Sequence, residues 1–173
     1  MLTVYHGSVY PVPKPLAQVG RPNLDFGQGF YVTDLHAQAV AWATRAANQG
    51  RPQWLSSYLF DKERAIASYR YLFFPAYNED WLDFIVKSRL GERPWLDYDW
   101  IEGGVADDRV IDTVNLYMLD IIPMELAIRR LAQHQPNNQL CLLNQALIEE
   151  CLSFVQAEPL NDKSRNGRSK NED

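Results

Sequence analysis

The 173-residue sequence has few cysteines, no long apolar run and no excess of basic residues. Cys141 and Cys151 form no Cys-x-x-Cys or Cys/His pattern, which argues against a metal site and favours two reduced, buried thiols in a cytoplasmic protein. No apolar run reaches the roughly 18 residues of a membrane span, and the N-terminal residues do not resemble a signal peptide. The net charge of −5 disfavours a permanent nucleic-acid surface.

Motifs that cradle nucleotide phosphates are missing as well. The chain contains neither the G-x-x-x-x-G-K-[ST] phosphate loop nor the G-x-G-x-x-G dinucleotide fingerprint. The run Gly27-Gln28-Gly29 is weak evidence for a ligand by itself, although its glycines predict an unusual backbone path just before a strand.

The length and the 46% apolar content suit one globular domain. We expect that domain to cover residues 1–158. The segment 159–173 contains no apolar residue after Leu160 and mixes both charges, so we predict a disordered polar tail.

Short strands and helices alternate unevenly along the chain, which predicts an α+β fold rather than a doubly wound parallel sheet. Asp34 is expected to cap the first helix, and Gly103-Gly104 to mark a bulge or a close backbone approach. Strands are expected at 2–5, 30–33, 54–60, 100–105 and 139–143, and helices at 35–48, 79–90, 107–119, 123–134 and 146–155.

His6 follows the first expected strand and precedes Gly7 and Ser8. These residues support two interpretations. His6 is either a satisfied core histidine beside a turn glycine, or a strand-end imidazole that hydrogen-bonds a ligand hydroxyl. In the second case, the bare backbone of Gly7 lets the ligand approach closely.

Aromatic residues occupy the next strand and the helix after it. Phe30 and Tyr31 should face opposite sides of their strand, so one ring is expected in the core and the other on the second face. Gln38 and Trp42 share one face of the helix. Trp42 is either a core residue or a flat wall opposite Tyr31. Two such walls beside a backbone amide form a slot for a planar heteroaromatic amide.

These segments together resemble a known superfamily. Tyr5-His6-Gly7-Ser8, the run from Gly27 to Tyr31, and Trp42 eleven positions later resemble the first two motifs of the ADP-ribosyltransferases, in their diphtheria-toxin and poly(ADP-ribose) polymerase branch. From Leu2 to about Val155 the chain more closely resembles the bacterial domain-of-unknown-function family 3990. The motifs of that second resemblance are Tyr5 to Ser8, Leu24 to Thr33, Gln38-Ala39 with Trp42-Ala43, Gly104 to Asp108, and Gln139 with Ala146-Leu147.

The resemblance implies a split antiparallel β-sheet core with flanking helices and a pocket for NAD. His6 would bind the hydroxyl of the adenine-side ribose, the Gly7 backbone would pair with the nicotinamide carboxamide, and Tyr31 and Trp42 would sandwich the nicotinamide ring. The paired glycines would let the chain wrap close to the dinucleotide. The expected NAD-binding set is His6, Gly7, Ser8, Gly29, Phe30, Tyr31, Gln38, Trp42 and Asp108.

The chain departs from the superfamily at the residue that usually carries catalysis, a glutamate on a later strand. Gln139 stands there instead, and it can hydrogen-bond a ribose hydroxyl but supplies no negative charge and no base. Asp107 or Asp108 offers an alternative carboxylate, although both also fit a helix start. The expected catalytic residues are therefore Gln139, Tyr31 and His6.

The resemblance implies an NAD-dependent mono-ADP-ribosyltransferase that needs no metal and modifies a macromolecular acceptor, either protein or nucleic acid. It also suggests a bacterial effector, or a toxin paired with a small antitoxin protein. Two alternatives follow from Gln139: an NAD or ADP-ribose binding module without transferase activity, and an NAD glycohydrolase.

Overall fold

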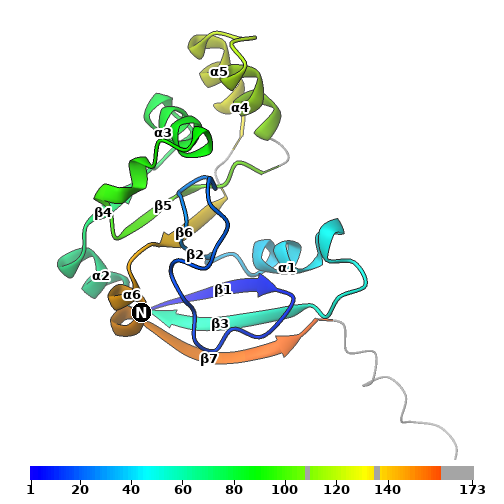
Figure 1. Cartoon of the computed structure of the whole chain (residues 1–173), viewed down its shortest axis with the longest axis vertical. Helices are drawn as coiled ribbons and strands as arrows, with labels where there is room; N and C mark the ends of the chain where they lie inside the picture. Colours follow the sequence, from blue (N-terminus) through cyan, green and yellow to red (C-terminus); the bar gives the residue numbers. More distant parts are fainter. Residues whose placement is uncertain (108–109, 135–136, 161–173) are drawn as a thin grey trace, which may run out of the picture.

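In the computed structural model, which describes residues 1–107, 110–134 and 137–160, the strands form two sheets. The first sheet is antiparallel throughout, with the order β1-β3-β7. The second has the order β2-β6-β5-β4. Figure 1 shows the two sheets one above the other. The strands are β1 (Leu2–Ser8), β2 (Phe30–Val32), β3 (Trp54–Phe60), β4 (Tyr71–Phe73), β5 (Trp100–Gly104), β6 (Asn138–Leu142) and β7 (Leu152–Pro159).

The helices flank this pair of sheets. Helix α1 packs on β1, whereas α3, α4 and α5 lie beyond the second sheet (Figure 1). No described helix combines the length and apolar character needed to cross a membrane. The α-helices are α1 (His36–Thr44), α2 (Lys62–Ser68), α3 (Glu79–Leu90), α4 (Ile111–Met118), α5 (Met124–Leu131) and α6 (Gln145–Cys151), and the 3-10 helices are η1 (Ala46–Asn48) and η2 (Pro94–Asp97).

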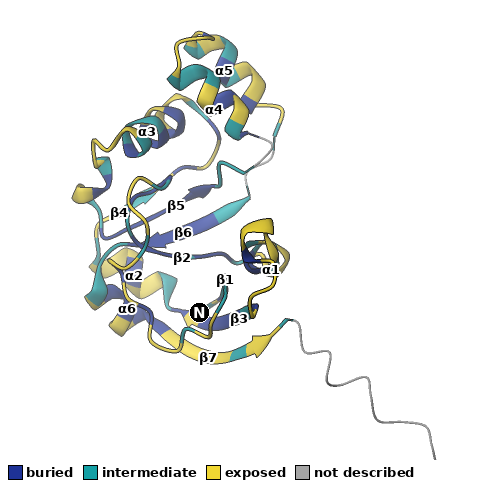
Figure 2. Cartoon of the chain, turned by 45° about the vertical axis from the view of Figure 1, so that its right-hand side comes forward, coloured by how far each residue is buried: buried dark blue, intermediate teal, exposed yellow. Residues whose placement is uncertain are grey.

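Two apolar clusters form the core, one on each face of the second sheet. Alternation along β6 divides its side chains between them, with Leu140 and Leu142 in one cluster and Cys141 in the other. The first cluster packs Cys141 and Ile101 against α3, α4 and α5. The second joins the two sheets to each other and to α6. Figure 2 shows the result, with β3, β5 and β6 buried and the edge strand β7 exposed.

The α+β prediction is confirmed, and most expected elements are present with shifted ends. The expected antiparallel core is wrong at one pair, because β4 runs parallel to β5. The expected helix 146–155 is wrong beyond Cys151, where the chain turns into β7 and pairs with β3. Strand β4 and helix α2 were not predicted, because both are short and carry no clear period. Strand β7 ends at Pro159, and residues 161–173 lie outside the described part of the chain.

Two local expectations near the N-terminus also need correction. Strand β1 does not stop before His6 but runs through Gly7 to Ser8, because β3 pairs with it along its whole length. Asp34 does not cap α1, whose cap position is Leu35 without a side-chain hydrogen bond. At Gly103, an added Cβ would lie 3.0 Å from the Cζ of Phe26 and 3.0 Å from the Cβ of Phe74, so side chains rather than another backbone segment approach this glycine.

The two sheets separate beside β1. Within the described residues, β1 and β2 meet in one isolated bridge, where Tyr5 and Thr33 exchange backbone hydrogen bonds of 2.8 and 3.0 Å. Beyond Tyr5 the two strands diverge. This divergence positions the site described next.

Candidate functional site

A cleft of about 780 Å³ opens where β1 and β2 diverge. Strands β1, β2 and β6, helix α1 and the loop between β1 and β2 contribute its walls. Most residues that the sequence suggested for a site therefore meet in one place. Of that set, the cleft is lined by His6, Gly7, Ser8, Gly29, Phe30, Tyr31, Trp42 and Gln139.

The backbone of β1 presents polar groups at this opening. Tyr5 directs its N–H and C=O toward Thr33 of the neighbouring sheet. In an extended strand, residues two apart direct these groups to the same edge. Gly7 lies opposite Leu55, two positions along β1 from the pair of Tyr5 and Ser57. The amide and carbonyl of Gly7 therefore also point away from β3 and toward the gap. A strand-edge donor and acceptor thus lie beside the cleft.

His6 links the two diverging strands. Its Nδ1 lies 2.7 Å from the carbonyl oxygen of Tyr31, which can only accept, so Nδ1 carries the proton and donates. The ring centroid lies 4.6 Å from that of Phe30. Burial lowers the pKa of His6, and the Tyr31 carbonyl only partly opposes this effect. The imidazole is therefore neutral, and its Nε2 keeps the lone pair with which it can accept a hydrogen bond.

Tyr31 is fixed by its hydroxyl group. The hydroxyl donates to the Gly27 carbonyl at 2.7 Å and accepts from the Phe26 amide at 3.1 Å. Burial raises the pKa of Tyr31 well above its ordinary value, so this phenol does not act as a base near neutral pH. Phe30 belongs to the apolar cluster between the sheets, whereas Tyr31 packs against the cluster on the opposite face of the second sheet. This confirms that the two rings face opposite ways.

The glycines near the cleft serve close packing within the protein. An added Cβ at Gly7 would lie 1.8 Å from the Ala39 carbonyl oxygen of α1, and one at Gly29 would lie 2.5 Å from the Cys141 sulfur. Gly27 has φ +89°, and a Cβ there would enter the ring of Trp95. In the direction of a side chain, these glycines therefore face other parts of the chain, which accounts for them by internal packing. The expectation that they let the chain wrap close to a dinucleotide stays a prediction, since Gly7 and Gly29 also line the cleft.

One predicted residue that the structure describes, Gln38, does not line the cleft. The Nε2 of Gln38 donates to the Asn138 carbonyl at 2.9 Å, and the Thr33 hydroxyl donates to the same oxygen. Gln38 thus fastens α1 to the start of β6 rather than lining the cleft beside Trp42. Asp108 lies outside the described residues. Trp42 is half-buried and does line the cleft.

Gln139 and Asp107 occupy different positions relative to the cleft. Gln139 is 3% exposed, and its Nε2 lies 3.5 Å from the Gly104 carbonyl oxygen, at the outer limit of a hydrogen bond. Asp107 accepts a hydrogen bond from Asn137 and its carbonyl begins the turn before α4, so it is not in the lining.

Charged residues are the part of the cleft that sequence reasoning missed. Asp25 is 9% exposed and forms a 2.5 Å ion pair with Arg89 of α3. Four further cations line the cleft from exposed positions, and none of them forms an ion pair with another described residue. No spacing in the sequence indicated this group, because its members come from separate loops. They are Lys14, Arg21, Arg45 and Arg51.

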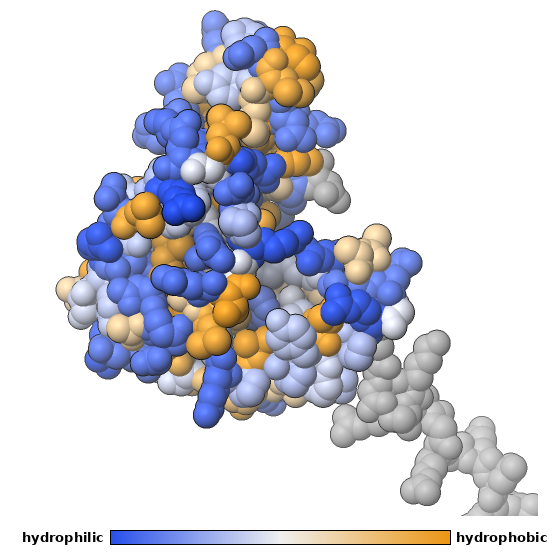
Figure 3. Space-filling view, viewed as in Figure 1, coloured by the Kyte–Doolittle hydropathy of each residue, from blue (hydrophilic) through white to orange (hydrophobic). Residues whose placement is uncertain are grey.

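The rim of the cleft is apolar. Tyr10, Leu16 and Val19 of the β1–β2 loop line it with large exposed side chains. Figure 3 shows apolar groups near the middle of this face, surrounded by a mostly hydrophilic surface. The mouth of the cleft therefore combines apolar contact area with exposed cations.

Comparison with known proteins gives one positive result. Residues 2–154 match the model of the family described as "Protein of unknown function (DUF3990)". The curated proteins and the solved structures contain no significant match to the chain. The matched segment covers the residues that line the cleft and every strand except the part of β7 after Phe154. The chain therefore belongs to the DUF3990 family.

Proposed function

We propose that the protein binds NAD in the cleft between β1 and β2 and transfers ADP-ribose to a macromolecule. One observation carries the proposal: the cleft combines aromatic side chains with a set of cations that have no described ion-pair partner, in a chain of net charge −5. A dinucleotide has the matching chemistry, since it joins flat heteroaromatic rings by an anionic pyrophosphate.

The residues of the cleft suit different parts of such a substrate. Tyr31 is locked by its hydroxyl and Trp42 is half-buried, which suits them to hold a nicotinamide ring by stacking. The strand-edge amide and carbonyl of Gly7 suit a carboxamide, which carries one acceptor and two donors. The neutral His6 suits a ribose hydroxyl, and the exposed Arg45 and Arg51 suit the pyrophosphate.

The proposed reaction breaks the bond between the nicotinamide nitrogen and the ribose C1′ atom. The bonding electron pair leaves with nicotinamide, which becomes neutral. An acceptor O–H or N–H group supplies the electron pair of the new bond to C1′ and releases its proton. Positive charge develops on the ribose in the transition state, so polar groups that orient the ribose hydroxyls favour the reaction.

Gln139 supports a second candidate function. Its amide lines the cleft and has the chemistry to hydrogen-bond a ribose hydroxyl, but it carries no negative charge to stabilise the developing cation. A binding module for NAD or ADP-ribose would need only the first property. NAD hydrolysis would use the same residues with water in place of the acceptor. Substitution of Gln139 by glutamate separates the binding module from the two enzymes, because it should raise turnover of NAD only if the cleft already aligns NAD for cleavage.

The proposal includes a cellular role as a bacterial toxin or effector whose cleft a small antitoxin protein covers. If so, induced expression should stop growth of a bacterial host, and the Trp42→Ala variant should relieve this arrest at equal protein level. Growth arrest that persists in this variant would contradict a toxic role for the cleft.

The main test incubates purified protein with labelled NAD and bacterial extract, followed by separate recovery of protein, RNA and DNA. Transfer predicts label in one macromolecular fraction together with free nicotinamide. Free ADP-ribose without a labelled macromolecule would indicate a glycohydrolase. Calorimetry without extract measures binding separately, and the absence of any NAD binding would overturn the whole proposal.

A further inference from the structure

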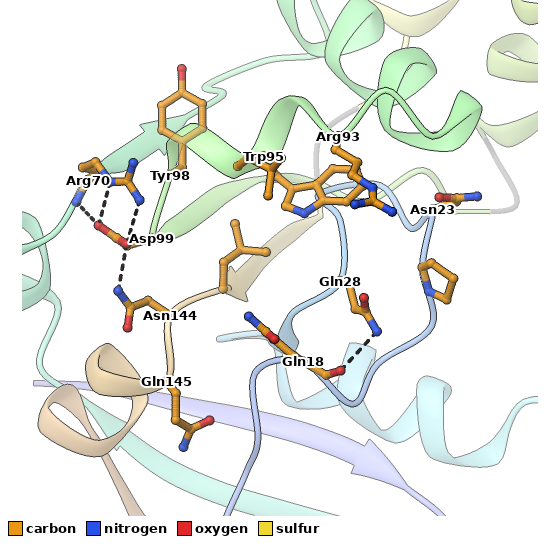
Figure 4. A pocket seen from close by; sticks show the side chains of 13 residues that line it. Gln18, Asn23, Gln28, Arg70, Arg93, Trp95, Tyr98, Asp99, Asn144 and Gln145 are labelled. Atoms are coloured by element: carbon orange, nitrogen blue, oxygen red, sulfur yellow. Dashed lines mark hydrogen bonds and ion pairs between the residues drawn. The ribbon is translucent and has the colours of Figure 1, made fainter.

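A second pocket lies on the far side of the loop that borders the cleft. It has a volume of about 540 Å³ and is walled by the β1–β2 loop, the η2 region and the turn after β6 (Figure 4). We call it the amide pocket and define it by Gln18, Asn23, Gln28, Arg93, Trp95 and Tyr98. Neither the family match nor the proposed NAD chemistry assigns it a role.

One loop separates the two cavities. Val19, Arg21 and Leu24 line the cleft, whereas Gln18 and Asn23 line the amide pocket. Gln28 holds the loop closed, because its Nε2 donates to the carbonyls of Gln18 and Gly20 at 3.1 and 2.8 Å. A molecule in the amide pocket would therefore lie one loop away from the cleft.

Part of the pocket wall is already satisfied by internal contacts. Asp99 accepts hydrogen bonds from Arg70 and Asn144, as Figure 4 shows. The pKa of Asp99 is lowered to about 2, mainly by the hydrogen bonds from the Arg70 guanidinium. This ion pair joins β4, β5 and the turn after β6. The paired Asp99 and Arg70 therefore neutralise each other and form a rigid end of the pocket that offers no unpaired charge to a ligand.

The opposite end offers groups with no described partner. The carboxamides of Gln18 and Asn23 are exposed and hydrogen-bond no other described residue. Arg93 is exposed and forms no ion pair within the described chain. Trp95 packs against Gly27, yet its ring also borders the pocket (Figure 4). The free end thus combines two carboxamides, one cation and a flat ring.

These groups match an unpaired nucleotide. Asn and Gln carboxamides offer a donor beside an acceptor, the pattern that reads a base edge, and aromatic or guanidinium planes stack on exposed bases. Arg93 adds a cation for the phosphate. A base within a duplex has its edge paired and its faces stacked, so it could not enter such a pocket.

A peptide is a weaker match to the same walls. Peptides commonly gain affinity by adding to a free strand edge or by laying a helix in an apolar groove. The amide pocket is bounded by loops and η2 and offers neither surface. Its lining carries two arginines against one aspartate, so it is locally basic in an acidic protein.

We infer that the amide pocket binds an unpaired nucleotide of a single-stranded nucleic acid. If the cleft transfers ADP-ribose as proposed, a single-stranded nucleic acid held in the amide pocket is the acceptor. This identification of the acceptor rests on the proposed function. The local basic charge at the two cavities resolves the apparent conflict with the negative net charge, because binding depends on charge at the contact.

The test measures fluorescence anisotropy of labelled oligonucleotides of about ten nucleotides, both DNA and RNA, with the full chain at low salt. The key variant is Asn23→Gly with Arg93→Asn. Both positions have positive φ, 59° and 58°, which glycine and asparagine tolerate, so the backbone is preserved. Gln18→Ala serves as a second variant, and Arg130→Gln on the exposed face of α5 removes an equal charge as the control.

We expect single-stranded oligonucleotides to bind more tightly than the duplex of the same sequence. The double variant should weaken this binding by about tenfold, while the control variant binds normally. Three results would overturn the inference: no binding, equal binding of the duplex, or binding that neither pocket variant changes. Equal competition by a poly-glutamate peptide would also overturn it, since that indicates charge attraction alone.

Calorimetry with NAD on the same protein samples keeps the two proposals apart. The pocket variants should bind NAD like the unmodified chain. Oligonucleotide binding without NAD binding would support the amide pocket and reject the proposed function of the cleft. NAD binding with no oligonucleotide binding would do the reverse.

Discussion

His6 lies where the two sheets separate, and its ring is held from both sides. Nδ1 donates to Tyr31 of β2 while the ring packs against Phe30. The sequence left open whether His6 is a structural or a ligand-binding residue. The contacts establish the structural role, because Nδ1 fixes the ring. The ligand-binding role stays a prediction, for which Nε2 keeps its lone pair.

Protonation of His6 should weaken the fold. Burial lowers the pKa of His6 below its ordinary 6.5, so the unfolded chain takes up this proton at a higher pH than the folded protein. Stability should therefore fall as the pH drops below about 6.5, with a slope of up to about 1.4 kcal/mol per pH unit from this one group. Thermal melts between neutral pH and the onset of carboxylate titration measure it. His6→Gln should flatten the profile in this range, because it removes this buried titrating group.

Trp42 provides the cleanest single-residue test of the cleft. Its side chain is half-buried, so Trp42→Ala should leave the melting temperature nearly unchanged while weakening NAD binding by about fivefold to tenfold, as expected for lost stacking of about 1 kcal/mol. Calorimetry measures the affinity. Trp54→Ala is the matched control, since this half-buried tryptophan of β3 does not line the cleft. Equal loss in both variants would mean that Trp42 contributes only to the fold.

At the scale of elements, the spacing between β1 and α1 depends on Gly7. The missing side chain allows the helix backbone to approach so closely that an added Cβ would lie 1.8 Å from the Ala39 carbonyl oxygen. The approach also brings Trp42 of the same helix to the cleft. One glycine therefore positions a residue of the cleft lining that lies thirty-five positions away in the sequence.

Gly7→Ala should destabilise the protein by about 3 kcal/mol or more. Strand and helix must both shift, because the nearest atoms, O and C of Ala39 and N of Ala43, all belong to the backbone of α1. Denaturant unfolding measures the change. Gly50→Ala is the control: it meets nothing within 4 Å and carries only the strain of its φ of +76°, a cost of about 1 kcal/mol. A Gly7→Ala variant as stable as the Gly50→Ala variant would show that α1 moves away without penalty.

At the scale of the whole molecule, charge is distributed unevenly. The net charge is −5, yet the cleft gathers Lys14, Arg21, Arg45 and Arg51. Such local fields attract an anion even when the molecule as a whole repels it. They also weaken as dissolved ions screen them.

NAD affinity should therefore decrease as the salt concentration rises, by about threefold or more from low salt to well above physiological ionic strength. Substitution of Arg45 and Arg51 by glutamine should lower the affinity and reduce its salt dependence. Calorimetry at several salt concentrations tests both effects. Arg130→Gln, which removes a charge far from the cleft lining, should alter neither. An unchanged salt dependence in the double variant would argue against contact between these arginines and the substrate.

Sequence reasoning reached some parts of this molecule because they are encoded locally. Helix α3 has a helical apolar period, an Asn78 cap and a terminal Gly91 in the left-handed conformation, all within a short segment. The opposite orientation of Phe30 and Tyr31 follows from strand geometry. The last strand escaped prediction because its pairing partner, β3, lies far away in the chain.

The amino-acid sequence by itself determined the class of fold, the family and the short motifs that supply the cleft with His6, Gly7, Tyr31 and Trp42. These features depend on neighbouring residues, so a linear pattern records them. Only the tertiary structure decided that Gly27 and Gly29 serve internal packing, that scattered cations converge, and that one loop separates two cavities. Each of these depends on the distance between residues remote in the chain, which is set by the packing of the two sheets against their helices.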